Sequence, residues 1–593
     1  MTAAESPRMR LRPGVAVTPL RAGLHLRGRD GSVTLEGSRA LPALWELLAD
    51  QLGHGPEDGR GGQEDLPRPR PRLDPADPRV ESALAALSSQ LHAHDLLAEY
   101  PAGAAEPAAW LGASTHRPGL AAAALAAARP VVAAADPAGP LATALISALE
   151  RAGTRPEVFR DTGLPADRVV AVAGTPPVAV AVARTADGGF ATAPAEPGRA
   201  HSDAESIAAR LCPATGSAPA GTTAGAPSAL TALLAGAAAQ RLLCAAAGLP
   251  DPAGREEDPR LLPDRPAVLV AEARPPHASY HPWVTGPVDP TAPSPSPAGN
   301  LDEALRRIGA LGDPHLGVLD APRPGRLPQL PAALAACRTP AGPLVAGAPR
   351  ADLARLTAGC RAAELHLDDG TSGPVAVGAG PGHALGRALR RAALAAADRS
   401  GPGRALSEEE WREHPQARHW WTVLTRHLEL PMEMTVHRFP AEQAYLAVVR
   451  DPAAEAGTAG VSARAVEATP ADAAALAALG AVTRAMAAEH GPAGAVHTVF
   501  SGAEAALATT GVEPAAWTDE GWTDRWLAGM ARREPELCAA LARLTGLRPE
   551  PWQPGAADLT GNGAAGPVRA AEPVRAALHA CGFTVLAGWG GAR

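Results

Sequence analysis

The segment Glu413–His427 (EHPQARHWWTVLTRH) holds three histidines and a glutamate, which are side chains that can bind metal ions. Pro415 breaks a helix between His414 and His419, so these two histidines do not share a helix face. His419 and His427 lie two helical turns apart, too far to bind one ion. We therefore expect surface histidines here and no metal site.

The cysteines and basic residues exclude other chemistries. No Cys-x-x-Cys pair and no His/Cys cluster has zinc spacing, which predicts buried thiols rather than a zinc site or a disulfide framework. All 54 basic residues are arginine. A lysine Schiff base and a P-loop lysine are therefore impossible. The six cysteines are Cys212, Cys244, Cys337, Cys360, Cys538 and Cys581.

Three further groups of residues favour structural roles. Ser501 in VFSGAE lacks the glycine that precedes the serine of a GxSxG nucleophile elbow. Ser407–Glu410 (SEEE) is typical of a helix N-terminus, with a serine cap and acidic residues near the positive end of the helix dipole. Trp517, Trp522 and Trp526 are predicted to anchor a core or a domain contact.

A phosphate site is not expected in the first strand–turn–helix unit. A strand at Pro130–Asp136 leads through AADPAGP to a helix at Leu141–Ala152, and strands follow at Arg168–Ala173 and Val178–Ala183. This alternation predicts a parallel sheet of nucleotide-binding type. The turn has one glycine, two prolines without N–H groups and an aspartate where a phosphate would lie, so it cannot cradle a phosphate.

The chain begins with three short alternating stretches and two apolar helical repeats. Leu11–Leu20, Gly23–Gly28 and Ser32–Gly37 alternate as strands do, and Asp30-Gly31 supplies hairpin turn residues. Helical spacing follows at Leu41, Leu44, Leu47, Leu48 and Leu52, and again at Val80, Leu84, Leu87 and Leu91.

This arrangement predicts a winged-helix module, which binds either DNA or a peptide. A DNA reader needs a basic recognition helix. Helix Val80–Tyr100 has Glu81, Asp95 and Glu99 and no basic residue except histidine. Net charge is −8, which also gives no argument for nucleic acid. Peptide binding is therefore favoured.

The stretch Leu11–Leu52 resembles the PqqD-like recognition domain, which binds leader peptides of ribosomally made peptide natural products. The resemblance implies that a leader pairs with strand Ser32–Glu36 by strand addition and lies against helix Val80–Tyr100. The expected peptide-binding residues are Ser32, Val33, Thr34, Leu35, Glu36, Leu84, Leu87, Ser88 and Leu91.

Residues Pro130 to about Thr285 resemble a ThiF-like domain of azole-forming gene clusters. An alanine-rich helix at Leu230–Leu249 leads to a strand at Ala267–Ala271 and to His281-Pro282, which matches the end signature of that family. Trp283 and Val284 follow where that family has zinc cysteines. The resemblance therefore does not carry a zinc site into this chain.

The C-terminal region loosely resembles YcaO-like proteins. The matching features are a D-x-x-x-G-V strand in Gly312–Asp320, the segment Leu327–Pro331 and a glycine turn at Pro374–Gly380. In catalytic YcaO enzymes the following helix carries glutamates that hold magnesium and ATP. Here His383–Ala396 has no carboxylate and has three arginines, which cannot bind magnesium. They are Arg387, Arg390 and Arg391.

These patterns predict an α/β multidomain chain. We expect a winged-helix (PqqD-like) module at 1–102 with a flexible insertion at 53–72, a degenerate ThiF-like Rossmann-type domain at 103–290 and a degenerate YcaO-like α/β domain at 291–593. No run of about 18 apolar residues without charge or proline occurs, so we expect a cytoplasmic protein that neither spans a membrane nor binds nucleic acid.

The expected function is that of a non-catalytic subunit without catalytic residues, metal or cofactor. It would present a precursor peptide to a partner YcaO cyclodehydratase for azoline formation on Cys, Ser or Thr, as in thiopeptide biosynthesis. A homodimer is left open. The first alternative is a stand-alone ATP-using cyclodehydratase or adenylating enzyme, and the second is a winged-helix transcription regulator.

Overall fold

The computed structural model divides into two compact units, which are described separately. The first comprises Met1–Ala204, Ala220–Arg255 and Ala271–His277, and the second Glu205–Pro219, Glu256–Val270 and Ala278–Arg593. The three predicted domain boundaries stay predictions. The residues described here are 8–20, 23–28, 31–38, 40–52, 73–100, 109–212, 228–254, 258–263, 265–286, 295–368, 374–401, 403–440, 442–453, 463–511, 522–547, 550–551 and 568–587. The predicted insertion at 53–72 lies outside them.

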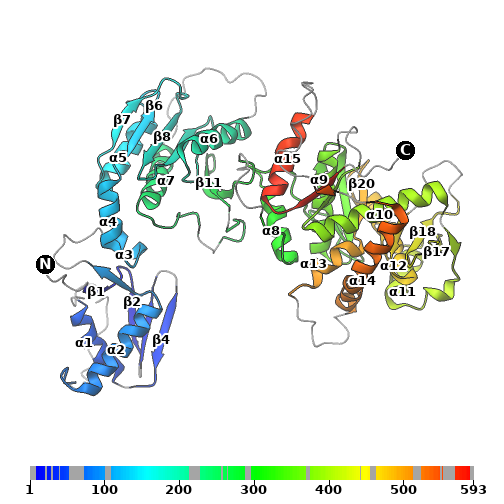
Figure 1. Cartoon of the computed structure of the whole chain (residues 1–593), viewed down its shortest axis with the longest axis horizontal. Coiled ribbons are helices and arrows are strands. Elements are labelled where there is room, and N and C mark those ends of the chain that lie inside the picture. Colours follow the sequence, from blue (N-terminus) through cyan, green and yellow to red (C-terminus); the bar gives the residue numbers. More distant parts are fainter. Residues whose placement is uncertain are drawn as a thin grey trace. The chain divides into compact units, whose positions relative to one another are not determined.

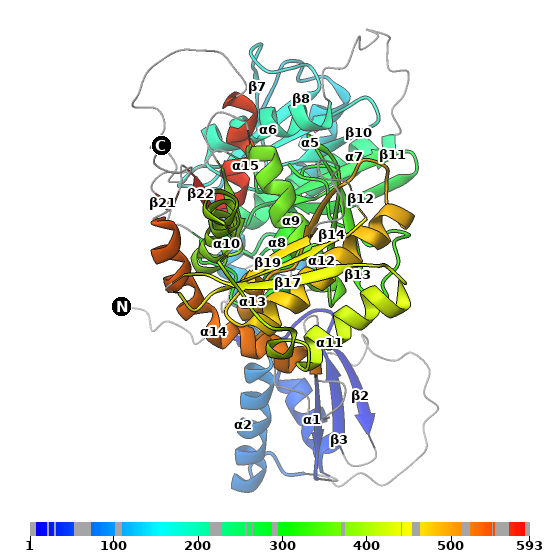
Figure 2. The ribbon, with the colours of Figure 1, turned by 90° about the vertical axis from the view of Figure 1, so that its right-hand side faces the viewer.

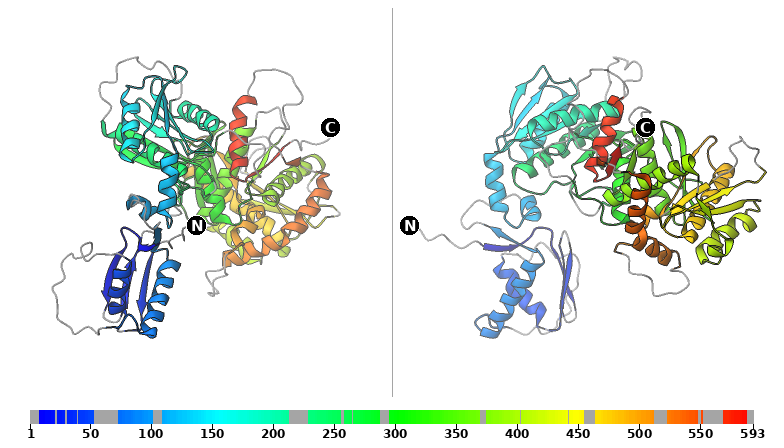
Figure 3. Two further views of the ribbon diagram at one scale, coloured as in Figure 1. Left: turned by 60° about the vertical axis from the view of Figure 1, so that its left-hand side comes forward. Right: turned by 45° about the vertical axis from the view of Figure 1, so that its right-hand side comes forward.

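The first unit begins with a small sheet whose inner face is covered by two helices (Figures 1 and 3). Leu24 and Leu26 of the middle strand are fully buried and pack against Leu44, Leu48 and the apolar residues of the second helix. The elements are β1 (Arg8–Leu11), β2 (Ala16–Leu20), β3 (Gly23–Arg27), β4 (Ser32–Glu36), α1 (Leu41–Gln51), α2 (Pro78–Ala93) and β5 (Leu97–Tyr100). β2, β3 and β4 form one sheet in that order, and β1 pairs with β5.

Two predicted elements have different bounds. The stretch Leu11–Leu20 divides into β1 and β2, and the helix predicted to reach Tyr100 ends at Ala93. Asp95 has a left-handed backbone (φ 54°), which ends the helix, and its carboxylate accepts a hydrogen bond from Arg12 at 2.5 Å. The chain then continues as β5, which is antiparallel to β1, with Leu97 opposite Leu11.

The chain from Ala109 to Pro282 builds a larger sheet. Its strand order is β12-β11-β10-β9-β8-β6-β7. The elements are α3 (Ala109–Ser114), α4 (Pro118–Ala127), β6 (Val131–Ala134), α5 (Pro140–Arg151), β7 (Glu157–Arg160), β8 (Arg168–Ala173), β9 (Val178–Arg184), β10 (Gly188–Ala191), α6 (Pro197–Leu211), α7 (Ser228–Ala246), β11 (Ala267–Ala273) and β12 (Pro276–Pro282).

The predicted parallel sheet is wrong for most of these strands. β6 and β7 are parallel, but β8 is antiparallel to β6 and to β9, and β10 is antiparallel to β9. The physical reason is connection length. Parallel neighbours need a crossover of about a dozen residues or more. Only the four residues 174–177 join β8 to β9.

The second unit contains three sheets, and their arrangement with the long helix α12 is seen in Figure 2. The sheets are β13-β14-β20, β15-β22-β21 and β16-β17-β18-β19. The first elements are α8 (Leu301–Leu311), β13 (Ala333–Thr339), β14 (Gly342–Ala348), α9 (Ala351–Leu367), β15 (Ala376–Gly378), α10 (Pro381–Ser400), β16 (Arg404–Ala405), η1 (Glu408–Glu410), α11 (Pro415–Thr422) and η2 (Val423–His427).

The remaining elements of this unit complete the sheets and enclose α12. They are β17 (Glu433–Arg438), β18 (Tyr445–Arg450), β19 (Ala463–Glu467), α12 (Pro470–His490), β20 (Val496–Val499), η3 (Gly502–Glu504), α13 (Ala505–Thr509), α14 (Trp522–Thr545), β21 (Glu550–Pro551), α15 (Val568–Ala580) and β22 (Thr584–Ala587). Thr469 caps α12 by accepting the Asp472 N–H at 3.1 Å. Trp526 then donates to the buried Asp472 carboxylate at 2.8 Å.

Among the described residues, two helices are long and apolar enough to cross a membrane by length and composition alone, Ala229–Ala246 and Pro470–His490. In the second of these, 83% of the apolar window is buried inside the protein. Its apolar surface is thus explained by packing against β14, β18 and β19.

The predicted strand in Gly312–Asp320 is a series of turns instead. Asp313 follows the end of α8, and its Oδ1 accepts the backbone N–H groups of His315 and Leu316 at 2.9 Å each. A side chain that accepts hydrogen bonds from backbone N–H groups two or three residues further along the chain favours a turn over a strand. The segment Leu327–Pro331 is likewise irregular, whereas Leu301–Leu311, directly before these turns, is a regular helix.

Candidate functional site

The predicted peptide-binding strand is an edge strand. Among the described residues, β4 pairs with β3 alone. The Gly28 N–H donates to the Gly31 carbonyl at 2.8 Å, so these two residues form a hydrogen-bonded pair. Such pairs alternate along an antiparallel ladder, which leaves the N–H and C=O groups of Ser32, Thr34 and Glu36 on the open edge. This edge is suited to strand addition.

Side chains of β4 alternate in exposure as the sequence predicts. Ser32, Thr34 and Glu36 are exposed, whereas Val33 and Leu35 are partly buried against the core of the module. Thr34 Oγ1 lies 2.8 Å from His25 Nδ1 of the neighbouring strand.

Most of the predicted groove residues on α2 lie in the core of the module. Leu84, Leu87 and Leu91 are only 6%, 5% and 0% exposed and form part of the module's core, so they do not line an open groove. Ser88 is partly exposed. The reason is that α2 has one apolar face, and the sheet and α1 already cover it.

A hollow does lie between the start of β4 and the end of α2. Its volume is about 310 Å³. Ser32 and Val33 line one side, and the turn after α2 lines the other. The other lining residues are Arg12, Pro13, Val15, Gly28, Gly31, Ala93, His94, Asp95, Leu96 and Ala113.

The second unit contains a network of buried arginines and glutamates that the sequence does not reveal. Arg387 and Arg390 of α10 are buried. Arg387 donates to Glu364 of α9 at 3.1 Å and to Glu504 of η3 at 2.6 Å. Arg390 donates to two further carboxylates, at 2.8 Å and 2.6 Å. These belong to Glu467 at the end of β19 and Glu534 of α14.

The network has a cationic end and an anionic end. Glu364 pairs with three arginines, namely Arg387, Arg391 and Arg361. Arg390, in contrast, is the one arginine paired with both Glu467 and Glu534. Positive charge is therefore in excess around Glu364, and negative charge around Arg390.

The pKa directions agree with this asymmetry. Burial raises the pKa of Glu364, but the charges of Arg387 and Arg391 outweigh it and lower that pKa to about 2. At the other end, burial dominates and raises the pKa of Glu467 above its ordinary value, although Arg390 opposes this. Glu364 is thus firmly ionised, whereas Glu467 favours its protonated form more than a free glutamate does.

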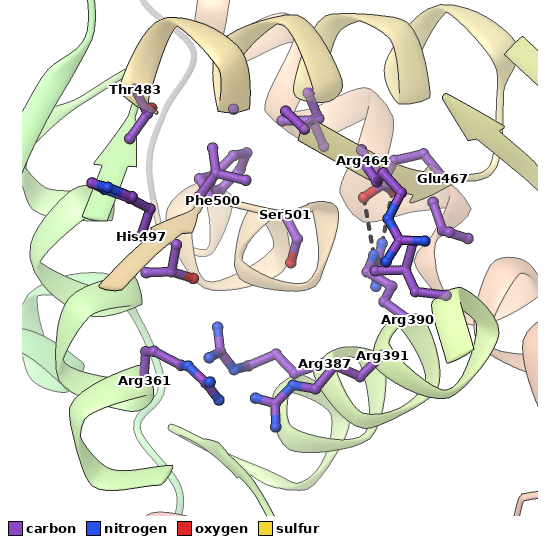
Figure 4. Close-up of a pocket in the computed structure, with 18 of the residues that line it drawn as sticks. Arg361, Arg387, Arg390, Arg391, Arg464, Glu467, Thr483, His497, Phe500 and Ser501 are labelled. Atoms are coloured by element: carbon purple, nitrogen blue, oxygen red, sulfur yellow. Dashed lines mark hydrogen bonds and ion pairs between the residues drawn. The ribbon is translucent and has the colours of Figure 1, made fainter. Parts of the chain in front are cut away.

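A cavity of about 350 Å³ opens over this network, lined by α10, β19, α12 and β20 (Figure 4). Six of its lining residues are arginines and one, Glu467, is acidic. Figure 4 shows the side chains of Arg361, Arg387 and Arg391 along one side, with Ser501 opposite. The arginines are Arg361, Arg387, Arg390, Arg391, Arg464 and Arg484.

Three groups on the wall have no partner among the described residues. Thr483 is 1% exposed and its Oγ1 makes no hydrogen bond, and His497 Nδ1 is also buried without one. Arg484, which is partly buried, makes no ion pair. Burial, followed by the charge of Arg484, lowers the pKa of His497. Of these groups, the partly buried Arg484 is available to a polar ligand, and an anion would suit it best.

These residues do not fit a magnesium site. Within the described ranges, no group of three or more His, Cys, Asp or Glu side chains is placed to hold a metal ion. The four glutamates of the network, of which Glu364, Glu467 and Glu504 are buried, are instead occupied by guanidinium groups. No step of the proposed chemistry is therefore assigned to a metal.

Several other predicted residues have structural roles. Ser501 Oγ donates to Glu504 at 2.6 Å and caps η3, and Ser407 with Glu410 forms a capping box at η1. The predicted helix N-terminus at Ser407 is thus present, although the helix is 3₁₀. His419 packs edge-on against Trp420. Trp526 is a core residue, as predicted; Trp517 lies outside the described residues, as does the side chain of Trp522.

The buried glutamates carry a weak signal in the sequence. Glu364, Glu467 and Glu504 each interrupt an alanine-rich or valine-rich stretch (RAAELHL, ARAVEATP, FSGAEAAL). A carboxylate within an apolar stretch is expected to be buried with a cationic partner. The partner itself cannot be identified from such a stretch.

Comparison with known proteins gives distant structural likenesses. No family model and no curated protein matches the chain. One similar solved structure is "Heterocyclase in complex with substrate and Cofactor", with 12% identity, a TM-score of 0.47, and coverage of 98% of this chain and 94% of that one. Another is "Structure of the heterocyclase TruD", with 12% identity, a TM-score of 0.43 and the same coverage.

These titles correct one prediction. The sequence analysis expected a non-catalytic subunit, whereas both solved chains are named as heterocyclases, which are enzymes. The expectation rested on three absences in the sequence, namely phosphate-binding glycines, zinc cysteines and carboxylates within His383–Ala396. We do not retain it.

Proposed function

We propose that this chain is an ATP-using peptide heterocyclase, which forms azolines on Cys, Ser or Thr residues of a ribosomal precursor peptide. The observation that carries the proposal is the cavity over α10, whose wall presents six arginines and one acid. The resemblance of Leu11–Leu52 to PqqD-like domains supports its leader-binding part. In this proposal the first module binds the leader and the cavity binds the phosphate groups of ATP.

The cavity suits phosphate groups for a chemical reason. Guanidinium groups form paired, charge-assisted hydrogen bonds with phosphate oxygens. Arg484 makes no ion pair with any described residue, and Thr483 offers a buried hydroxyl. The arginines around Glu364 retain an excess of positive charge. Phosphate would therefore satisfy groups that the protein leaves unpaired.

The reaction balances as follows. The Cys, Ser or Thr side chain loses its proton and adds to the preceding backbone carbonyl carbon, which closes the ring, and the former carbonyl oxygen then takes the terminal phosphoryl group of ATP. That oxygen leaves as inorganic phosphate while the ring nitrogen loses its proton, which forms the C=N bond of the azoline. The peptide loses one water overall, and ATP becomes ADP.

The β4 edge would hold the leader. Backbone groups of Ser32, Thr34 and Glu36 face outward and can pair with an extended peptide, as strand addition requires. Binding the leader raises the effective concentration of the core residues that react.

The proposal is tested by titrating the full chain with ATP and by measuring the mass of a precursor peptide after incubation. We expect ATP to bind and the peptide to lose one water per ring. Arg484→Ala, which changes the cavity wall, should weaken ATP binding. Its matched control is Arg338→Ala, because Arg338 is 89% exposed and lies outside the cavity wall. A folded chain that binds no ATP and leaves the peptide mass unchanged would refute the proposal.

A further inference from the structure

Three side chains of the second unit form a hydrogen-bonded chain outside the arginine cavity. Ser279 and His281 are two residues apart on β12, so they project from the same face of the strand. Ser279 Oγ lies 2.8 Å from His281 Nε2. His281 Nδ1 lies 2.8 Å from Asp313 Oδ2, in the turn that follows α8.

The protonation of this chain follows from its hydrogen bonds. Burial alone would raise the pKa of Asp313, but hydrogen bonds from His281 and from the Leu316 N–H lower it overall, so the carboxylate is ionised. An ionised carboxylate only accepts hydrogen bonds, which places the imidazole proton on Nδ1. The lone pair on Nε2 then faces the Ser279 hydroxyl and accepts its proton. This is the tautomer that a general base needs.

The base is also held in place. The side chains of His281 and Asp313 are each 8% exposed. Asp313 Oδ1 accepts two backbone N–H groups of its own turn, while Oδ2 remains available to His281. The His315 ring packs edge-on against His281 with the ring centroids 4.7 Å apart. Ser279, in contrast, is partly exposed and can be reached from solvent.

We propose that Ser279 is a nucleophile that accepts acyl groups from esters or thioesters, with His281 as its base and Asp313 as the residue that positions the base. Nucleophile and base are within hydrogen-bond distance, and a third group orients the base, as covalent catalysis requires. Alcohols and thiols leave more readily than amines, which limits the substrate class to activated acyl groups. This proposal is independent of the proposed heterocyclase function.

The reaction proceeds in two balanced steps. Ser279 Oγ attacks the acyl carbon while its proton passes to His281 Nε2, and the alcohol or thiol leaves with that proton. Water then attacks the acyl-serine, again losing a proton to Nε2, and the carboxylic acid is released as Ser279 recovers its hydrogen. No redox partner is needed.

The test uses the full chain with a fluorophosphonate probe and with p-nitrophenyl acetate. We expect labelling at Ser279, located by peptide mass spectrometry, and ester hydrolysis that a Ser296→Ala control retains in full, because that variant changes an exposed serine of the same unit outside the site. Ser279→Ala should abolish both signals. Asp313→Asn keeps an oxygen for the turn but favours the wrong histidine tautomer, so the labelling rate should fall about a thousandfold or more.

Two outcomes would overturn the proposal. One is an absence of label on Ser279 in a chain whose melting curve is intact. The other is labelling that Asp313→Asn leaves unchanged, which would mean that the hydrogen-bonded chain only ties β12 to the turn. Ser279→Ala is a small change at a partly exposed strand position, so its folding can be verified by circular dichroism.

Discussion

The β4 edge and the arginine cavity differ in how their chemistry is assembled. The edge offers backbone groups of one five-residue strand, and its neighbour β3 follows from the adjacent hairpin. The cavity depends on side chains far apart in the sequence, such as Arg390 and Glu534, which are 144 residues apart. Local pattern therefore suffices to predict the edge strand, whereas the cavity exists only after folding.

The two sites also differ in what holds them together. The edge has few buried contacts of its own, so a change there should alter binding and leave stability nearly intact. The cavity is built on buried charges, each of which is costly without its partner. Substitutions at the two sites should therefore differ in their effect on stability.

Removing a buried carboxylate should have the largest effect. Glu364→Ala leaves Arg361, Arg387 and Arg391 without their shared partner. We expect the free energy of unfolding to fall by about 3–5 kcal/mol, measured by urea denaturation. Glu408→Ala, which removes an exposed partner of Arg412, is the control and should change stability by less than about 1 kcal/mol. Equal losses in both variants would contradict the account of the network.

The same carboxylate predicts how stability depends on pH. The pKa of Glu364 falls from 4.5 to about 2 on folding, so its ionised form stabilises the folded state. That stabilisation is complete above pH 4.5 and is lost as pH falls from 4.5 toward 2. Glu364→Gln should flatten this part of the stability curve. Parallel curves for the two proteins would show that Glu364 is not the group responsible.

Ligand binding in the cavity should respond to Arg484. This residue has no ion-pair partner among the described residues, so Arg484→Ala should leave stability nearly unchanged. Loss of one charge-assisted hydrogen bond costs about 1.5–3 kcal/mol, which weakens ATP binding roughly 10- to 150-fold. Titration calorimetry measures this effect. An unchanged ATP affinity would place the nucleotide elsewhere.

The smallest effect is expected at the strand edge. Thr34→Pro removes an outward-facing backbone N–H but keeps the hydrogen bonds between β4 and β3. Thr34→Ala keeps the N–H as well as those hydrogen bonds. One lost hydrogen bond costs about 1 kcal/mol, so leader binding should weaken about fivefold in the proline variant alone. Fluorescence polarisation with a labelled leader measures this. Equal affinity of both variants would exclude pairing at Thr34.

The comparison also explains what the sequence can predict. The three alternating strands of the first module, α1 and α8 follow from residue periodicity and turn residues, which act over a few positions. The end of α2 depends on the contact between Arg12 and Asp95, 83 residues apart, and could not be found in this way. The four-residue connection between β8 and β9 fits only an antiparallel pair, whereas strand–helix alternation predicts a parallel one.

The arginines of α10 show what the sequence could not predict about the cavity. The sequence shows three arginines and no carboxylate within His383–Ala396, from which we expect that this stretch does not bind magnesium. It does not show that Glu364, Glu467, Glu504 and Glu534 converge on them. Pairing between distant segments is set by the tertiary fold, so neither the cavity nor its charge asymmetry is visible beforehand.

The most direct test of the central claim is the mass of a leader-bearing precursor peptide after incubation with this chain and ATP, without any second protein. The account predicts that the peptide loses one water per ring, that the loss requires ATP and the leader, and that Arg484→Ala slows it. A peptide of unchanged mass, incubated with a folded chain and ATP under conditions where the leader binds, would contradict it.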